Sequence, residues 1–102
     1  MPLKYLFSNY FHQDWTEEAT TVGEVVAAFL GNEPSSVLAE TLRDLERLLA
    51  AGHSDSELND ILLNDLGSYY DPHFVGQETK SFLLGIQEQI RAALSDTGRN
   101  DR

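Results

Sequence analysis

The sequence contains no cysteine, only three prolines and few basic residues. The absence of cysteine excludes disulfide scaffolds, thiolate zinc sites and cysteine nucleophiles, and it gives no reason to expect an oxidising compartment. No stretch approaches the roughly 18 uninterrupted apolar residues of a membrane span. The start also lacks a cationic stretch followed by a long apolar run, so we expect no signal peptide. Together these absences favour a soluble cytoplasmic protein without a membrane partner.

Positive charge is scarce, since 7 Lys and Arg stand against 17 Asp and Glu and the formal net charge is −10 at pH 7. No Lys or Arg occurs between Lys4 and Arg43, or between Arg47 and Lys80. Because nucleic-acid binders replace counterions with Lys and Arg, direct binding of DNA or RNA is not expected. A negative field instead raises encounter rates with a basic protein such as a nuclease, although the same charge can serve solubility alone.

Length and periodicity predict a single all-α domain. A chain of 102 residues with 41% hydrophobic residues is long and apolar enough for one folded core. Apolar residues recur at three- and four-residue spacing in five segments, which predicts helices over about 3–11, 22–30, 34–51, 54–66 and 78–94. Short connections favour a compact, antiparallel, bundle-like arrangement over residues 1–95, followed by a polar and flexible C-terminal tail over 96–102.

Capping patterns predict where these helices begin and end. A Ser, Thr or Asp three residues before a Glu is typical of a reciprocal capping box. The pattern occurs for Thr21 with Glu24, Ser54 with Glu57, and Asp14 with Glu17. The Asp14 pair is expected to open a turn or a single helical turn, whereas Gly52 and Gly67 are expected to end the third and fourth helices. The interval 68–77 has no helical period and is predicted to be a loop.

Aromatic residues gather in two segments outside the main helices. Eight of the ten lie in the first fifteen residues or in the 68–77 loop: Tyr5, Phe7, Tyr10, Phe11, Trp15, Tyr69, Tyr70 and Phe74. An irregular segment so rich in rings is seldom solvated, since each ring can bury about 150 to 250 Å². We therefore expect both segments to be buried across the end of the bundle, against each other.

Two His/Asp pairs raise the question of catalysis. His12 with Asp14 and Asp71 with His73 both lie in segments outside the predicted main helices, and converged they could bind a metal or act as acid and base. Such spacings are common in caps and turns, so we expect no catalytic residue, metal or cofactor here. A small metal-dependent or acid/base enzyme using these four residues stays the alternative, beside an acidic helical adaptor for another basic partner.

The segments Tyr10-Phe11-His12-Gln13-Asp14-Trp15 and Tyr69-Tyr70-Asp71-Pro72, with the helices between them, resemble a family of small bacterial immunity proteins from contact-dependent growth inhibition (CDI) systems. The resemblance extends to about Leu94. It implies a non-enzymatic cytoplasmic protein that binds and neutralises the cognate C-terminal toxin domain of a CDI effector. That domain is expected to be a nuclease such as a tRNase, neutralised by occlusion of its active site or substrate groove.

Within this resemblance, the aromatic segments are expected to form a scaffold and the acidic surface to contact the toxin. The scaffold residues are Tyr10, Phe11, His12, Trp15, Tyr69, Tyr70 and Pro72. The expected contacts are acids in the cation-free stretches, namely Asp14, Glu17, Glu18, Asp60, Asp65 and Asp71. A nuclease tends to be basic around its substrate groove, so these carboxylates would be attracted to it.

Overall fold

The fold is helical throughout the part of the chain that the computed structural model describes, which is the backbone of residues 2–100 and the side chains of 2–17 and 19–95. The elements are α1 (Pro2–Tyr10), α2 (Trp15–Glu18), α3 (Val22–Asn32), α4 (Ser35–Ala50), α5 (Asp55–Asp60), the π-helical segment η1 (Ile61–Asp65), the 3-10 segment η2 (Pro72–Val75) and α6 (Thr79–Asn100). Within this range no strand occurs, so the all-α expectation is confirmed.

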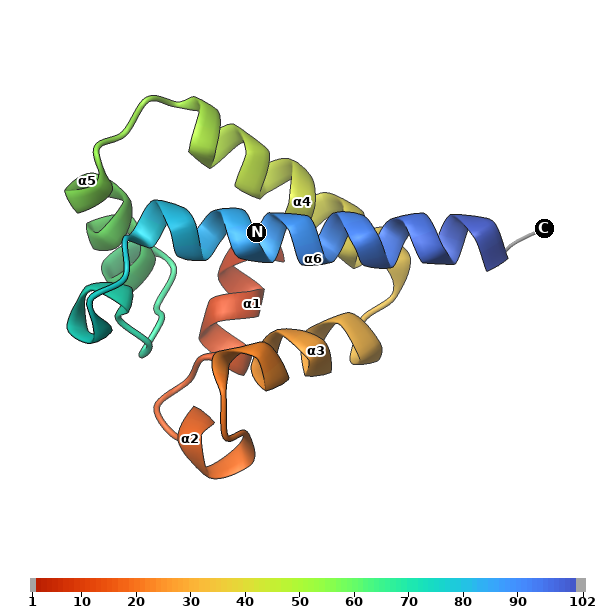
Figure 1. Ribbon diagram of the computed structural model, residues 1–102, viewed down its shortest axis with the longest axis horizontal. Coiled ribbons are helices and arrows are strands. Elements are labelled where there is room, and N and C mark those ends of the chain that lie inside the picture. Colours follow the sequence, from red (N-terminus) through yellow and green to blue (C-terminus); the bar gives the residue numbers. More distant parts are fainter. Residues whose placement is uncertain (1, 101–102) are drawn as a thin grey trace.

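The long C-terminal helix α6 is the element on which the others assemble. It contacts α3, α4, α5 and η2, while α1 contacts α3 and α4. In Figure 1, α4 runs opposite to α3 and α6, and α1 lies across them. The arrangement is thus antiparallel for α4 and α6, which are in contact, with α1 as a crossing helix.

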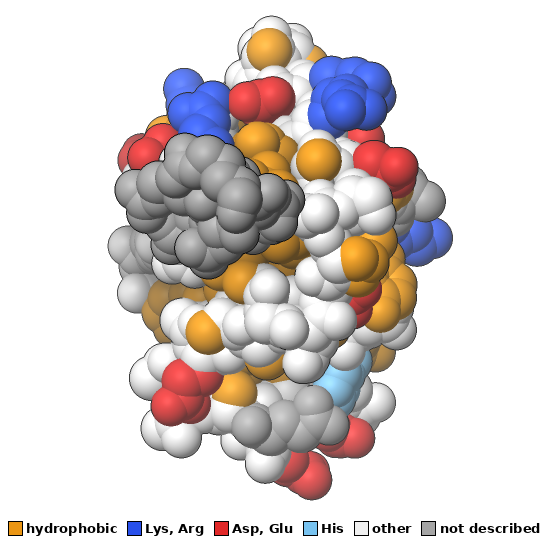
Figure 2. All heavy atoms as spheres, turned by 90° about the vertical axis from the view of Figure 1, so that its right-hand side faces the viewer, with side chains coloured by type: hydrophobic (Ala, Val, Ile, Leu, Met, Phe, Trp, Pro, Cys, Tyr) orange, Lys and Arg blue, Asp and Glu red, His pale blue; other side chains and the backbone are white. Residues whose placement is uncertain are grey.

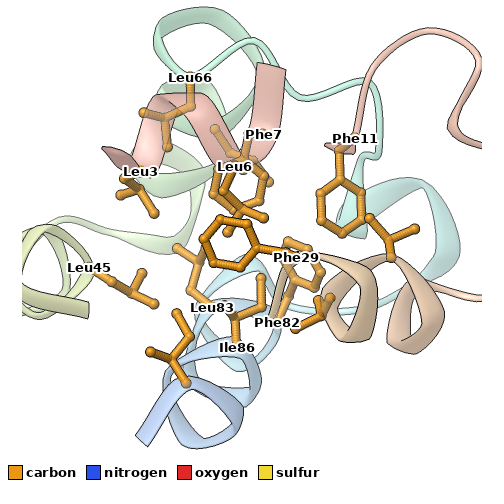
Figure 3. Packing of buried hydrophobic residues seen from close by; sticks show 14 of the residues in the cluster. Leu3, Leu6, Phe7, Phe11, Phe29, Leu45, Leu66, Phe82, Leu83 and Ile86 are labelled. Carbon is orange, nitrogen blue, oxygen red and sulfur yellow. The ribbon is translucent and has the colours of Figure 1, made fainter. Parts of the chain in front are cut away.

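Apolar faces of four helices supply most of the core. Leu3, Leu6 and Phe7 of α1 are fully buried, as are Phe29 of α3 and Leu45 of α4. Figure 3 shows these side chains pointing toward one another and toward Phe82, Leu83 and Ile86 of α6. The leucine stripe of α4 therefore serves the core, because a helix of a small domain must bury its apolar face to be stable.

Helix ends agree with the sequence at most positions. Two of the three predicted capping boxes form, at Thr21 with Glu24 and at Ser54 with Glu57. Asp14 does occupy the N-cap position of α2, but the capping box predicted for it does not form. Its backbone has φ −104° and ψ 22° instead of the extended conformation of a cap, and its side chain makes no capping hydrogen bond. The single helical turn expected after it does form, as α2.

Two further boundaries differ from the prediction. The interval 68–77 is not wholly a loop, because Pro72 starts the 3-10 turn η2 and Gly76 ends it at φ +78°. The helix α6 continues past Leu94 to Asn100. Residues 101–102 and the side chains of 96–100 lie outside the described residues, and the flexibility expected of 96–102 stays a prediction.

Candidate interaction surface

The two aromatic segments meet at one end of the bundle. The Tyr69 backbone N–H donates to the Phe11 carbonyl over 2.8 Å. The Tyr70 ring lies 5.8 Å from Trp15 in an edge-on arrangement, 6.0 Å from Phe11 and 5.0 Å from Phe82 between centroids. Rings at these separations interact favourably beyond the area that they bury. The expectation that the two segments pack against each other is confirmed.

The turn η2 next to this junction is held at both ends. Asp71 begins it, with its Oδ1 accepting the His73 backbone N–H over 3.0 Å. Pro72 is buried, and its carbonyl accepts the Gln77 N–H over 2.9 Å after the left-handed Gly76. A turn closed in this way presents the side chains between its ends in a defined position.

The expectation that all the rings are buried is wrong at this turn. Phe74 is 88% exposed, and its neighbours Tyr69 and Val75 are 64% and 60% exposed. The reason is that Phe11, Trp15 and Phe82 already surround Tyr70, which leaves no core space for the side chains that follow. These exposed groups border an open pocket of about 430 Å³. It is lined by Trp15, Tyr69, Tyr70, Asp71, Phe74 and Val75.

The two predicted His/Asp pairs make different contacts, one within a local turn and one with a residue of another helix. His12 Nδ1 accepts the Asp14 backbone N–H over 3.1 Å, so this pair forms a local turn. His73 Nε2 lies 2.6 Å from Oδ2 of Asp55, on α5, with the ring N–H donating to the carboxylate. Among the described residues no three His, Cys, Asp or Glu side chains are placed to hold a metal ion.

Asp55 joins three elements at once, which the sequence did not reveal. Besides His73, its carboxylate accepts the backbone N–H groups of Thr79 over 3.1 Å and Lys80 over 2.8 Å. It therefore satisfies the free N–H groups at the start of α6 from a different helix. The hydrogen bond from His73 is the largest cause that lowers the pKa of the Asp55 carboxyl, and the two backbone bonds add to it against the opposing effect of burial.

Tyr10 of the first aromatic segment anchors α1 to the end of α3. Its hydroxyl donates to Glu33 Oε2 over 2.7 Å, and Tyr5 donates to the same oxygen over 2.8 Å. Burial, together with the adjacent carboxylate, raises the pKa of Tyr10 to about 12. The hydrogen bond to Glu33 is the main cause that raises the pKa of Tyr5. Both phenols are held protonated, as a donor to a carboxylate must be.

The acids predicted to contact a partner are spread over three regions. Asp14 and Glu17 are exposed around α2, Asp60 and Asp65 are exposed at the ends of α5 and η1, and Asp71 is half-buried at η2. The side chain of Glu18 lies outside the described residues. Figure 2 shows Lys and Arg side chains mixed with Asp and Glu toward the upper end of the face that it draws, whereas Asp and Glu without Lys or Arg lie toward its lower end.

Phe74 and Val75 are candidate surface residues that sequence reasoning missed. The available signal was an aromatic and a β-branched residue between Pro72 and Gly76, in a segment too short and too irregular to offer a buried face. Large exposed apolar groups that lie side by side are a more informative sign of an interaction surface than single ones. Among the predicted contact residues whose side chains are described, Asp71 alone lines this pocket.

Comparison with known proteins bears on the family of the chain, and the apolar character of its helices bears on membrane insertion. Among the described helices, none has the length and apolar character that crossing a membrane requires. No curated protein matches the chain. A chain of the crystal structure of a CdiA-CT/CdiI complex from Y. kristensenii 33638 is 30% identical to this one and superposes with a TM-score of 0.82, covering 87% of this chain and 95% of that chain. The sequence model of a protein family, described as CdiI immunity protein, matches residues 1–90 of the chain. The chain therefore belongs to this family.

Proposed function

We propose that the chain is an immunity protein that binds the C-terminal toxin domain of a cognate CDI effector and neutralises it. The observation that carries this proposal is family membership over residues 1–90, joined to the similarity with a chain from a CdiA-CT/CdiI complex. The protein acts by binding and has no catalytic role of its own. Its place of action is the cytoplasm, where an incoming toxin would meet its substrate.

The charge of the chain supports a basic partner, and a nuclease is the class that fits best. A nuclease presents Lys and Arg around its substrate groove, so an acidic protein that lies over or beside the groove blocks substrate by occupancy and by repulsion of phosphates. Asp14 suits such a contact because its carboxylate is exposed and forms no cap on α2. Glu17 lies on the same short helix and is also exposed.

Titration calorimetry with the cognate toxin domain, made catalytically inactive, tests the proposal. We expect tight one-to-one binding that weakens as salt rises, because attraction between exposed charges is screened beyond roughly 10 Å at 0.1 M salt. Tight binding that salt leaves unchanged would support the immunity function and contradict the electrostatic contact. The absence of binding at both low and high salt would contradict the function itself.

A further inference from the structure

We infer that the pocket between α2 and η2 receives an Arg or Lys side chain of the toxin domain. Trp15, Tyr69, Tyr70 and Phe74 supply its rings, and Asp71 supplies a carboxylate. This inference rests on the proposed function, because the cationic side chain belongs to the bound partner. It adds to that function an apolar and aromatic anchor, where the sequence had pointed only to acidic contacts.

The first argument is the exposure of Phe74 on a turn that cannot fold it inward. The Phe74 backbone N–H donates to the Asp71 carbonyl over 3.1 Å, and the turn closes again from Gly76 to the His73 carbonyl over 3.1 Å. His73 itself is held by Asp55 over 2.6 Å. The Phe74 ring is thus presented to solvent by a backbone that is already ordered. Binding then requires little further ordering, which is a property of residues that dominate interfaces.

The second argument is the chemistry of the pocket. The faces of aromatic rings attract cations, and several rings around one position form the kind of cage that binds ammonium and guanidinium groups. The described residues that line the pocket include one carboxylate and no Lys or Arg. Asp71 uses Oδ1 for the bond from His73, and within the described part of the chain Oδ2 accepts no hydrogen bond. That second oxygen is available to a guanidinium or ammonium donor.

The charge of Asp71 acts on Tyr70, which lines the pocket beside it. Burial raises the pKa of the Tyr70 hydroxyl, and the negative charge of Asp71 raises it further. The Tyr70 hydroxyl donates to Gln77 Oε1 over 3.2 Å, so its proton is already used in a hydrogen bond to another residue. A cation in the pocket would therefore meet a negative potential that nothing else in the lining compensates.

The occupant is a basic protein in preference to a second copy of this chain. Each copy carries a formal charge of −10, so two copies repel each other, whereas a partner rich in Lys and Arg is attracted. The longest cation-free stretches, between Lys4 and Arg43 and between Arg47 and Lys80, include every residue that lines the pocket. The pocket thus lies in the part of the chain where its own cations compete least.

Two substitutions in the pocket and one outside it test the inference by calorimetry against the inactive toxin domain. Phe74→Ala removes an exposed ring, and Asp71→Asn removes the charge while its amide oxygen can still accept the His73 N–H. We expect each substitution to raise the dissociation constant at least about tenfold, as the truncation of an interface anchor does. Leu84→Ala, at a residue of α6 that is 42% exposed and outside the pocket lining, is expected to bind like the wild type.

A second pair of measurements identifies the chemistry of the contact. Phe74→Leu keeps an apolar side chain and removes the ring face, so we expect it to bind weakly, like the alanine variant. Trp15 is the single tryptophan, and its indole N–H gives one resonance in the isotope-labelled protein. We expect this resonance to shift when unlabelled toxin domain is added. Melting curves of the free variants check that all of them remain folded.

The outcomes separate this inference from the proposed function. If the wild type binds the toxin domain and both Phe74→Ala and Asp71→Asn bind with the same affinity, the pocket is not part of the interface. The immunity function would still stand. If Phe74→Leu binds with full affinity, the pocket does not receive a cation. The same conclusion follows if the free protein forms a dimer and Phe74→Ala abolishes that dimer. Failure of the wild type to bind would instead remove the proposed function, and the inference with it.

Discussion

Gly67 lies where Ser8 of α1 packs against the segment that follows the π-helical turn. Its φ is +77°, and a Cβ added there would lie 3.2 Å from Oγ of Ser8. Ser8 Oγ donates to the Leu66 carbonyl over 3.1 Å, so the hydroxyl cannot move away without losing a hydrogen bond. Gly67 is therefore required both for its left-handed backbone and for the space that it leaves.

Gly76 provides a matched comparison at the residue scale, because its φ of +78° is nearly the same but an added Cβ would meet nothing within 4 Å. Gly76→Ala is expected to lower the free energy of unfolding by about 1 kcal/mol through backbone strain alone. Gly67→Ala should lower it by about 2 kcal/mol or more, because the contact with Ser8 adds to the strain. Urea denaturation measures both values, and equal losses would show that the contact with Ser8 is relieved without cost.

At the scale of elements, Asp55 links α5, η2 and the start of α6. Its pKa is lowered from an ordinary value of 3.8, so the folded state favours the ionised carboxylate. The stabilisation is complete well above that ordinary value, and it is lost as pH falls through the lower pKa of the folded state. Asp55→Asn should cost about 1 to 2 kcal/mol at pH 7, as the loss of a helix cap does, and the difference from the wild type should shrink toward zero near pH 2.

Urea denaturation of both proteins at pH 7, 4 and 2.5 gives this difference directly. Asp60→Asn is a suitable control, since Asp60 is an exposed residue at the end of the same helix and its side chain makes no capping hydrogen bond. Surface changes of this kind alter stability by no more than about 0.5 kcal/mol. A difference between Asp55→Asn and wild type that stayed constant with pH would show that the carboxylate acts through packing and not through its charge.

The same elements show what the sequence could and could not predict. The capping boxes at Thr21 and Ser54 were predictable because each joins residues only three apart. The cap of α6 was not, because Asp55 reaches it across 24 residues of sequence. The exposure of Phe74 was likewise hidden, since it depends on which rings fill the space around Tyr70, and that is decided by tertiary packing.

At the scale of the whole molecule, the acidic surface and the pocket belong to neighbouring segments. Trp15 lines the pocket and follows Asp14 directly, and Asp71 both lines the pocket and begins η2. The segments that line the pocket lie in the two stretches of the sequence that contain no Lys or Arg, between Lys4 and Arg43 and between Arg47 and Lys80. A basic partner would therefore be drawn to the end of the molecule where the aromatic anchor is exposed. In this arrangement long-range charge would guide the encounter, while the pocket would determine how long the complex lasts.

Association kinetics test this division between charge and pocket. The double variant Asp14→Asn/Glu17→Gln removes two charges around α2, and Glu40→Gln/Glu88→Gln removes two exposed charges on α4 and α6. We expect the α2 variant to slow association with the toxin domain several-fold at low salt and to flatten its dependence on salt, with little change in dissociation. The control should slow association less, because its charges lie on other elements. Equal slowing by both would show that net charge alone guides the encounter, and unchanged rates in both would contradict the electrostatic contribution.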